Sequence, residues 1–114
     1  MEGSGRLSKR AHKIIESPAN QILISAAVAW ELAIKIGTGK MRPASLLEDL
    51  RVLSEKETFS EAAITMAMAI RAGLLPPHHR DPFDRMLIAQ SELLDVPILS
   101  ADAVLDLYHV KRLW

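Results

Sequence analysis

Residues 76–90 read Pro-Pro-His-His-Arg-Asp-Pro-Phe-Asp-Arg-Met-Leu-Ile-Ala-Gln, a stiff charged loop that runs directly into an apolar segment. Asp81 followed by Pro82 is typical of a helix start, because aspartate is a good N-cap and proline fits the first helical position. Asp84 then falls in the first turn, where the helix dipole stabilises a carboxylate. The stretch therefore predicts a helix over residues 82–94, and helix initiation by itself is enough to explain both acids.

The composition is that of a folded globular domain. Of the 114 residues, 49% are apolar and 25% are charged, and the length suits one domain with a genuine core. Lys plus Arg equals Asp plus Glu at 14 each, so any contact with nucleic acid must come from a local patch or a bound cation. The absence of cysteine excludes disulfides and thiolate metal sites. No apolar run is long enough to span a bilayer, and we expect a cytoplasmic protein without a membrane partner.

Helices and short strands alternate along the chain. Helices are expected over residues 7–16, 26–36, 45–53, 65–72, 82–94 and after Asp102, and strands over 21–25, 58–64, 96–100 and 108–114. Ser25 and Thr65 are expected helix caps, and residues 45–48 match a capping box. This alternation predicts an α/β fold, with a mostly parallel sheet between two layers of helices. Residues 1–5 are expected to be a disordered lead-in, and residues 6–114 a single domain.

Three acids stand near the carboxyl ends of the expected strands, where ligands of parallel sheets bind. Glu31 lies in the helix after the first strand, Asp84 in the first turn of the helix described above, and Asp102 just after a later strand. Converging carboxylates repel one another and persist mainly where a cation neutralises them. Oxygen ligands without cysteine or histidine at ligand spacing suit Mg²⁺ or Mn²⁺. Such an ion activates water and stabilises the charge that develops on a phosphodiester.

Each acid also has a plain structural interpretation. Glu31 precedes Lys35 by four residues, the order that favours a surface ion pair on a helix. Asp102 could serve only to cap the last helix, and Asp81 is expected to be a cap rather than a ligand. The histidine pair at 78–79 could touch a substrate phosphate, but adjacent histidines in a loop are usually solvated. Spacing alone leaves both interpretations open.

Residues 76–90 closely resemble the signature of one branch of the PIN-domain ribonucleases, the toxin halves of VapBC-type toxin–antitoxin pairs. The resemblance extends to residues 25–35 and 98–102 and covers nearly the whole chain from Arg6. Its most specific motif is Arg-Asp-Pro-Phe-Asp-Arg at 80–85.

The resemblance implies a three-layer α/β/α fold and an endoribonuclease that depends on Mg²⁺ or Mn²⁺. It also implies a cellular RNA substrate, inhibition by a cognate antitoxin, and frequent homodimers. The matching positions are the metal-binding and catalytic acids Glu31, Asp84 and Asp102, and the supporting residues Arg80, Asp81 and Arg85.

One part of the family's pattern has no counterpart here. Such toxins open with a hydrophobic strand that lies centrally in the sheet and ends in an aspartate, the first metal ligand. Residues 1–5 read Met-Glu-Gly-Ser-Gly instead, and no strand surrounds Glu2. Fewer anionic ligands weaken Mg²⁺ binding, and a lost central strand leaves its neighbours with unpaired backbone groups. We therefore expect a truncated version of the fold, with impaired or absent activity.

Three functions compete on this basis. The first is a ribonuclease toxin whose natural form is longer, which the reading frame upstream would decide. The second is a catalytically inactive remnant that still binds an antitoxin or RNA. The third is a metal- or RNA-binding domain without cleavage, which cutting that depends on Asp84 would exclude.

Overall fold

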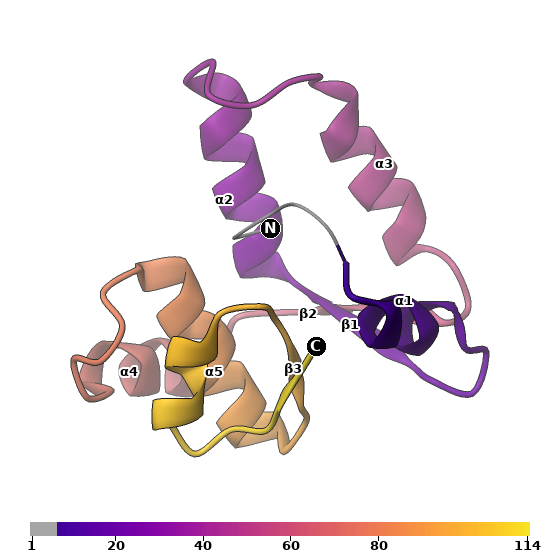
Figure 1. Cartoon of the computed structure of the whole chain (residues 1–114). Helices are drawn as coiled ribbons and strands as arrows, with labels where there is room; N and C mark the ends of the chain where they lie inside the picture. The colour runs from indigo at the N-terminus through magenta and orange to yellow at the C-terminus, as the bar shows by residue number, and fades with distance from the viewer. Residues whose placement is uncertain (1–6) are drawn as a thin grey trace. The chain divides into compact units, whose positions relative to one another are not determined.

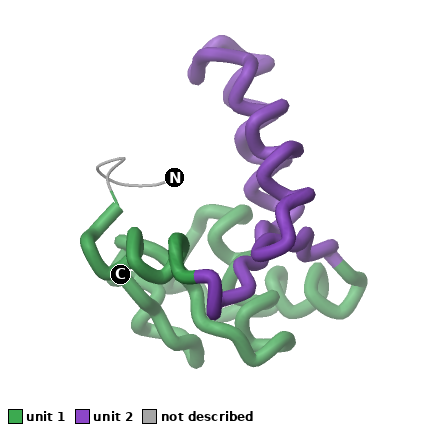
Figure 2. The backbone as a smooth tube through the Cα atoms, turned by 90° about the vertical axis from the view of Figure 1, so that its right-hand side faces the viewer, with its two compact units in different colours: residues 1–17, 65–114 green, residues 18–64 purple. Residues whose placement is uncertain are grey.

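The computed structural model describes residues 7–114, which form two compact units (Figures 1 and 2). Pro18–Ile64 is one unit, purple in Figure 2, and the other, in green, joins helix α1 (Lys9–Glu16) to Thr65–Trp114. The described residues contain five α-helices and two pairs of short parallel strands. The predicted α/β class is thus confirmed, whereas the lead-in predicted for residues 1–5 lies outside the described part of the chain.

The first of these units builds a parallel strand pair. Its elements in chain order are β1 (Ile22–Ser25), α2 (Ala26–Gly37), α3 (Ser45–Ser54) and β2 (Phe59–Ala62). The register runs from Ile22 opposite Phe59 to Ser25 opposite Ala62. Both strands match predicted ones. The Glu-Ala-Ala sequence in and after β2 favours helix, but pairing with β1 overrides that local preference.

Helix α2 begins and ends as its sequence predicts. The Ser25 hydroxyl accepts a hydrogen bond of 3.0 Å from the backbone N–H of Ala27, one of the amides that a helix start leaves without a partner. At the other end, both the amide and the hydroxyl of Thr38 donate to the Ile34 carbonyl, at 3.0 and 2.9 Å. Local side-chain chemistry therefore sets both ends of the helix.

The capping box predicted at residues 45–48 is wrong. Ser45 is itself the first residue of α3, and the N-cap position falls on Ala44, which provides no side-chain hydrogen bond. Glu48 instead accepts from the guanidinium of Arg51, with a shortest distance of 2.6 Å. That hydrogen bond lowers the pKa of Glu48 below its ordinary value. The residue expected to cap the helix therefore lies in its first turn, and the first acid of the helix joins an exposed ion pair.

The second unit carries the remaining elements. They are α1, α4 (Met66–Leu74), α5 (Pro82–Leu94), β3 (Ile98–Leu99), the 3-10 helix η1 (Ala103–Leu107) and β4 (Arg112–Leu113). Strands β3 and β4 are parallel and shorter than predicted. The buried core consists of Leu75, Ile88, Ile98, Leu105 and Tyr108. This core joins the loop after α4 to α5, β3 and η1, and so supports the segments that carry the acids.

Helix α4 starts where predicted but ends later. The Thr65 hydroxyl accepts from the Met68 amide at 3.2 Å, and the Met68 sulfur accepts from the Thr65 amide at 3.4 Å. The expected helix ends at Ala72, but the observed one continues through Gly73 to Leu74. The prediction fails because a distant side chain, Arg85, binds the last carbonyls of the helix, as described below.

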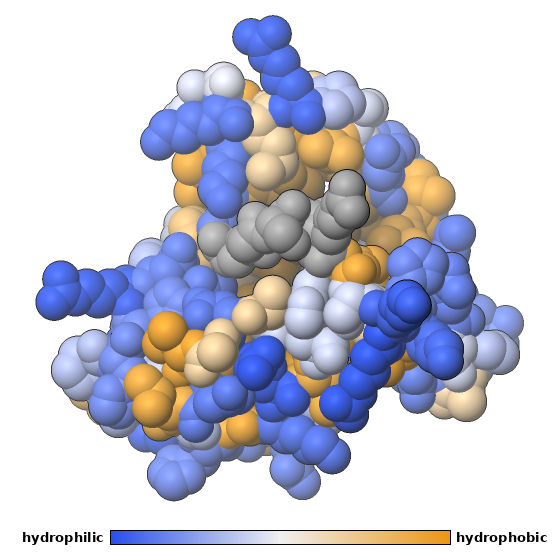
Figure 3. Space-filling view, in the orientation of Figure 1, coloured by the Kyte–Doolittle hydropathy of each residue, from blue (hydrophilic) through white to orange (hydrophobic). Residues whose placement is uncertain are grey.

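Large apolar side chains remain exposed in both units, among them Trp30 at 61%, Met66 at 81% and Leu74 at 75%. On the face drawn in Figure 3, apolar residues in orange reach the surface between hydrophilic ones in blue. In residues 7–114, no helix has both the length and the apolar character needed to cross a membrane.

Candidate metal centre

The site is built on the start of α5. Asp81 is the N-cap, and its Oδ1 accepts from the amides of Phe83 at 2.8 Å and Asp84 at 3.2 Å. Pro82 occupies the first helical position, where its missing N–H costs no hydrogen bond. The helix start predicted from the sequence is confirmed. Because Asp84 is the third helical residue, the cap also fixes the backbone from which its carboxylate projects.

The loop before α5 is held by the guanidinium of Arg85, which donates to backbone carbonyls. Its bonds to the loop are to the carbonyls of Leu75 at 2.7 Å, Pro76 at 3.0 Å and His79 at 2.9 Å. Further bonds reach Ala72 and Gly73 in the last turn of α4, where helix carbonyls lack partners. The contacts of Arg85 are therefore structural, since they join the end of α4 to the start of α5.

A buried tyrosine also holds this loop. The Tyr108 hydroxyl donates to the Pro76 carbonyl at 2.6 Å and accepts from the His79 amide at 2.7 Å. The exposed ring of His78 meets the ring of Tyr108 edge to face, with centroids 5.3 Å apart. The His79 backbone is thus bound at its N–H by Tyr108 and at its carbonyl by Arg85, so the position of this residue is set by tertiary contacts.

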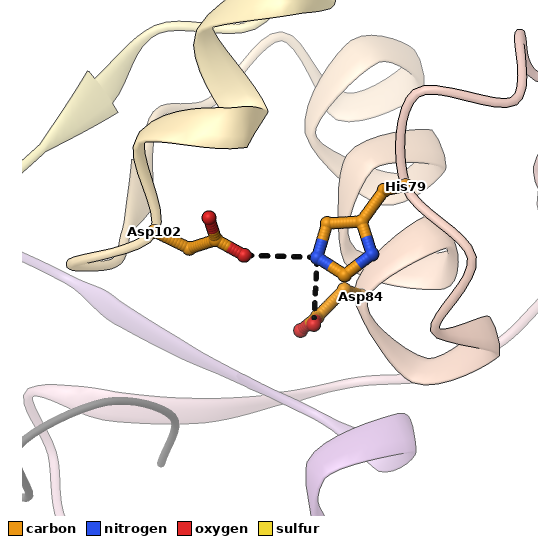
Figure 4. Close-up of side chains that lie close together, drawn as sticks. All are labelled: His79, Asp84 and Asp102. Atoms are coloured by element: carbon orange, nitrogen blue, oxygen red, sulfur yellow. Dashed lines mark hydrogen bonds and ion pairs between the residues drawn. The ribbon is translucent and has the colours of Figure 1, made fainter.

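His79 brings the two acids together (Figure 4). Its Nε2 lies 2.9 Å from Oδ2 of Asp102 and 3.1 Å from Oδ2 of Asp84. The side chains of His79 and Asp84 are each 14% exposed, and that of Asp102 is 27% exposed. The expectation that both histidines of the loop are solvated is therefore wrong for His79 and correct for His78. Three segments of one unit converge on a single imidazole nitrogen.

Asp102 acts both as a cap and as a member of this cluster. Its Oδ1 accepts from the Val104 amide at 3.0 Å at the start of η1, while its own amide donates to the Ser100 hydroxyl at 3.1 Å. Its other oxygen, Oδ2, is the one that meets His79. The two interpretations that the sequence left open for Asp102 are thus compatible, because each uses a different carboxylate oxygen.

Arg112 of β4 steadies the segment around Asp102. Its guanidinium donates to both carboxylate oxygens of Asp106, at 3.0 and 3.1 Å, and to the Ser100 carbonyl at 3.2 Å. The hydrogen bond from Arg112 lowers the pKa of Asp106, and Asp106 in turn raises the pKa of Arg112. The segment that presents Asp102 is therefore tied to the neighbouring strand at two points.

The other predicted site residues lie elsewhere. Glu31 lies on α2, in the unit Pro18–Ile64, and its Oε2 is 3.3 Å from Nζ of Lys35, the helix pair that its spacing suggested. Arg80 follows His79 in the loop and is exposed. The predicted convergence of acids is thus observed for Asp84 and Asp102, whereas the place of Glu31 in the site stays a prediction.

The donor atoms of the cluster fit a small cation. One ligand atom each from His79, Asp84 and Asp102 lies within 4.8 Å of the other two. Two carboxylates at this spacing repel each other unless a positive charge or a hydrogen-bond donor lies between them. Hard oxygen donors of this kind suit divalent ions such as Mg²⁺. The residues present are therefore compatible with a divalent metal centre.

The model of the PIN domain matches residues 4–112 of this chain. The chain belongs to the PIN domain family. The matched range spans both units, and membership implies the general nuclease function of PIN domains, which generally depend on a divalent metal. Comparisons with curated proteins and with solved structures found no match. The absence of the family's first strand stays a prediction, as does the restriction to the toxin branch.

Sequence reasoning missed two residues that organise this PIN domain site, His79 and Tyr108. A weak signal existed for His79, because it lies two residues before the N-cap Asp81, close enough for its ring to fold over the helix start. No local pattern marks Tyr108, which acts across 29 residues on the His79 amide.

Proposed function

We propose that this PIN domain is an endoribonuclease that hydrolyses phosphodiester bonds in RNA, depends on Mg²⁺ or Mn²⁺, and serves as the toxin of a toxin–antitoxin pair. The observation that carries the proposal is the meeting of Asp84 and Asp102 at one point, in a chain matched to the PIN domain from residue 4 to 112. Two carboxylates brought together from separate segments repel each other, and a bound cation would neutralise both of them more fully than the imidazole of His79 does.

Asp84 and Asp102 would hold the ion. When bound, such an ion activates water and stabilises the negative charge that develops on the phosphodiester. The protein's own residues hold the two acids in place. Asp81 orients the first turn of α5 under Asp84, and the Ser100 hydroxyl and Val104 amide orient Asp102. This preorganisation limits the rearrangement needed to bind the ion and the substrate phosphate.

Two further residues belong to the proposal. Glu31 enters as an acid required for cleavage, supported by the resemblance of residues 25–35 to the family's pattern. Arg80 is exposed next to His79 in the loop, and we propose that it pairs with a phosphate of the RNA. An isolated arginine of this kind contributes affinity rather than sequence preference.

The toxin assignment brings partners and a location with it. A cognate antitoxin would bind the domain and block cleavage, and a homodimer and a cytoplasmic location are part of the same proposal. Co-expression with the product of the adjacent small gene tests it. Co-purification of the two proteins together with loss of cleavage supports the toxin role, and independent behaviour of the two proteins contradicts it.

The central experiment measures RNA cleavage by the 114-residue chain in Mg²⁺ and in a chelator. Cleavage is expected only with the metal, and Asp84→Asn should abolish it. Asp95→Asn is the matched control, since Asp95 is the exposed acid at the opposite end of α5 and its φ of 55° is one that asparagine also adopts. Metal-dependent cleavage that survives in Asp84→Asn would contradict the proposed site.

A catalytically inactive PIN domain that binds an antitoxin or RNA is the alternative. The observation that favours it is that His79 already engages an oxygen of both acids. In line with this, we propose that cleavage by this chain is weak. Binding of antitoxin or RNA without any cleavage that depends on Asp84 would establish the alternative.

A further inference from the structure

The imidazole of His79 lies where a cation shared by Asp84 and Asp102 would be expected. Its Nε2 faces Oδ2 of both acids, at 2.9 and 3.1 Å (Figure 4). Its Nδ1 lies 3.2 Å from the backbone nitrogen of Asp81. Every contact is made by a side chain or amide within one unit of the chain. The question is whether this ring serves as a third metal ligand or takes the place of the metal.

The hydrogen bonds decide which ring nitrogen carries the proton. A backbone amide can only donate, so the Nδ1 that faces the Asp81 amide must accept with its lone pair. The ring proton of the neutral imidazole is then on Nε2. Nε2–H accordingly donates between the two carboxylates, and the ring has no lone pair facing the point where the acids meet.

A ligand role would require the other tautomer of the His79 ring. To bind a cation through Nε2, the imidazole would have to move its proton to Nδ1, where it would face the N–H of Asp81 donor to donor. With the ring held in place, that change would replace the bond to Asp81, whose side chain caps α5, by a repulsive contact between two N–H groups. The network is therefore built for an N–H that points at the acids, and that N–H competes directly with a cation for the same oxygens.

We propose that His79 is a placeholder for the divalent cation, which holds Asp84 and Asp102 together in the metal-free protein and must rotate away when the metal binds. The proposal rests on the proposed metal-dependent function. The backbone of His79 is bound at its N–H by Tyr108 and at its carbonyl by Arg85, so the proposed rotation involves the side chain and leaves both backbone contacts in place. His79 would thereby keep the two acids together before the metal binds, and its competition for their oxygens would lower the metal affinity of the domain.

If His79 is a placeholder, its removal should lower the stability of the metal-free protein and raise the affinity for Mg²⁺. Removal of the ring leaves the two acids to repel each other, so the metal-free protein should unfold at a lower temperature. Removal also eliminates a competitor, so Mg²⁺ should bind more tightly, by roughly tenfold if the lost competitor is worth one hydrogen bond to a charged group. A ligand role predicts the reverse for the metal, because the site would lose a donor.

The experiment titrates Mg²⁺ into the full chain by calorimetry and by thermal denaturation, for the wild type and His79→Ala. His78→Ala is the matched control, since it removes the neighbouring imidazole, which is exposed and packs on Tyr108. Tighter Mg²⁺ binding in His79→Ala alone, with a lower melting temperature without metal, is the expected result. Unchanged or weaker binding would overturn the placeholder.

A second measurement needs no variant that might fold poorly. Two-bond ¹H–¹⁵N NMR spectra of the wild-type imidazoles should show the proton of His79 on Nε2 with and without Mg²⁺. A shift of that proton to Nδ1 on Mg²⁺ addition would identify His79 as a ligand and overturn the proposal. Asp84→Asn distinguishes the two proposals. If Mg²⁺ binding is lost in Asp84→Asn but is not tighter in His79→Ala, the metal centre stands and only the placeholder role of His79 is refuted. Mg²⁺ binding that is absent from every variant refutes the metal centre as well.

Discussion

The acids of the two units are held in different ways. Glu31 in Pro18–Ile64 pairs with Lys35, four residues along the same helix. Asp84 and Asp102 in the other unit meet through His79, and the contact from His79 to Asp102 joins residues 23 positions apart in the chain. The first arrangement follows from helix geometry alone, whereas the second exists only if α5, η1 and the loop before α5 are all in place.

This difference separates two kinds of carboxylate. An i,i+4 helix pair such as Glu31–Lys35 contributes only a few tenths of a kcal/mol to stability, and the spacing of the two residues on one helix is enough to form it. The pair of Asp84 and Asp102 is enforced by caps and by tertiary hydrogen bonds, and it gathers charge at one point. A fold that maintains such a cluster is expected to use it, which is why the nuclease proposal is centred there.

Among the substitutions that test this contrast, the largest expected effect is the one of Glu31 on RNA cleavage. If the acid is required for chemistry, Glu31→Gln should reduce RNA cleavage by about 100-fold, the upper end of the range for substitutions around a metal site. Lys35→Gln removes the same ion pair but keeps the acid, so it should leave cleavage nearly unchanged and shift stability by about 0.3–0.5 kcal/mol. Equal cleavage by both variants would show that Glu31 is only a partner of Lys35.

A large loss of stability is expected when the anchor of the loop is changed. Arg85→Lys keeps the charge but cannot reach carbonyls of both the α4 end and the loop, because an ammonium lacks the planar fork of guanidinium. The free energy of unfolding should fall by about 3 kcal/mol, since several partly buried carbonyls lose a charged donor. Urea denaturation measures it. Arg51→Lys, in the exposed ion pairs of α3, is the control and should leave the free energy of unfolding nearly unchanged.

A smaller effect is expected at the tyrosine that holds His79. Tyr108→Phe removes the hydroxyl that bridges the Pro76 carbonyl and the His79 amide, and it should lower the free energy of unfolding by about 1–2 kcal/mol. Hydrogen exchange of the His79 amide should become faster at the same time, which a general loss of packing would not confine to that residue. Unaltered exchange at His79 would contradict the assigned hydrogen bond.

The smallest effect should come from the exposed pair between Asp106 and Arg112. Its hydrogen bond lowers the pKa of Asp106 below the ordinary value of 3.8, so the stabilisation is fully present above that pH and is lost as the pH falls through the lowered pKa. The wild type should therefore melt slightly above Asp106→Asn near neutral pH, and the gap should close in acid. A difference in melting temperature that widens in acid would contradict a lowered pKa of Asp106.

Local features of the fold were the most predictable from the sequence. Ser25, Thr65 and Asp81 cap the helices that their positions predict, because each side chain needs only an amide two or three residues away. The capping box at residues 45–48 failed by a single position, since the pattern does not reveal whether the serine falls before the helix or in its first turn. The end of α4 failed because Arg85, far along the chain, binds its last carbonyls.

The amino-acid sequence alone thus determined the α/β pattern, the start of α5, and the two acids Asp84 and Asp102 as members of a candidate site. Tertiary structure alone decided that His79 lies between them, with its Nε2 within 3.1 Å of an oxygen of each carboxylate. The reason is physical. Capping acts over one helical turn and leaves a local pattern, whereas the place of His79 depends on Tyr108, Arg85 and η1, which meet only after the chain has folded.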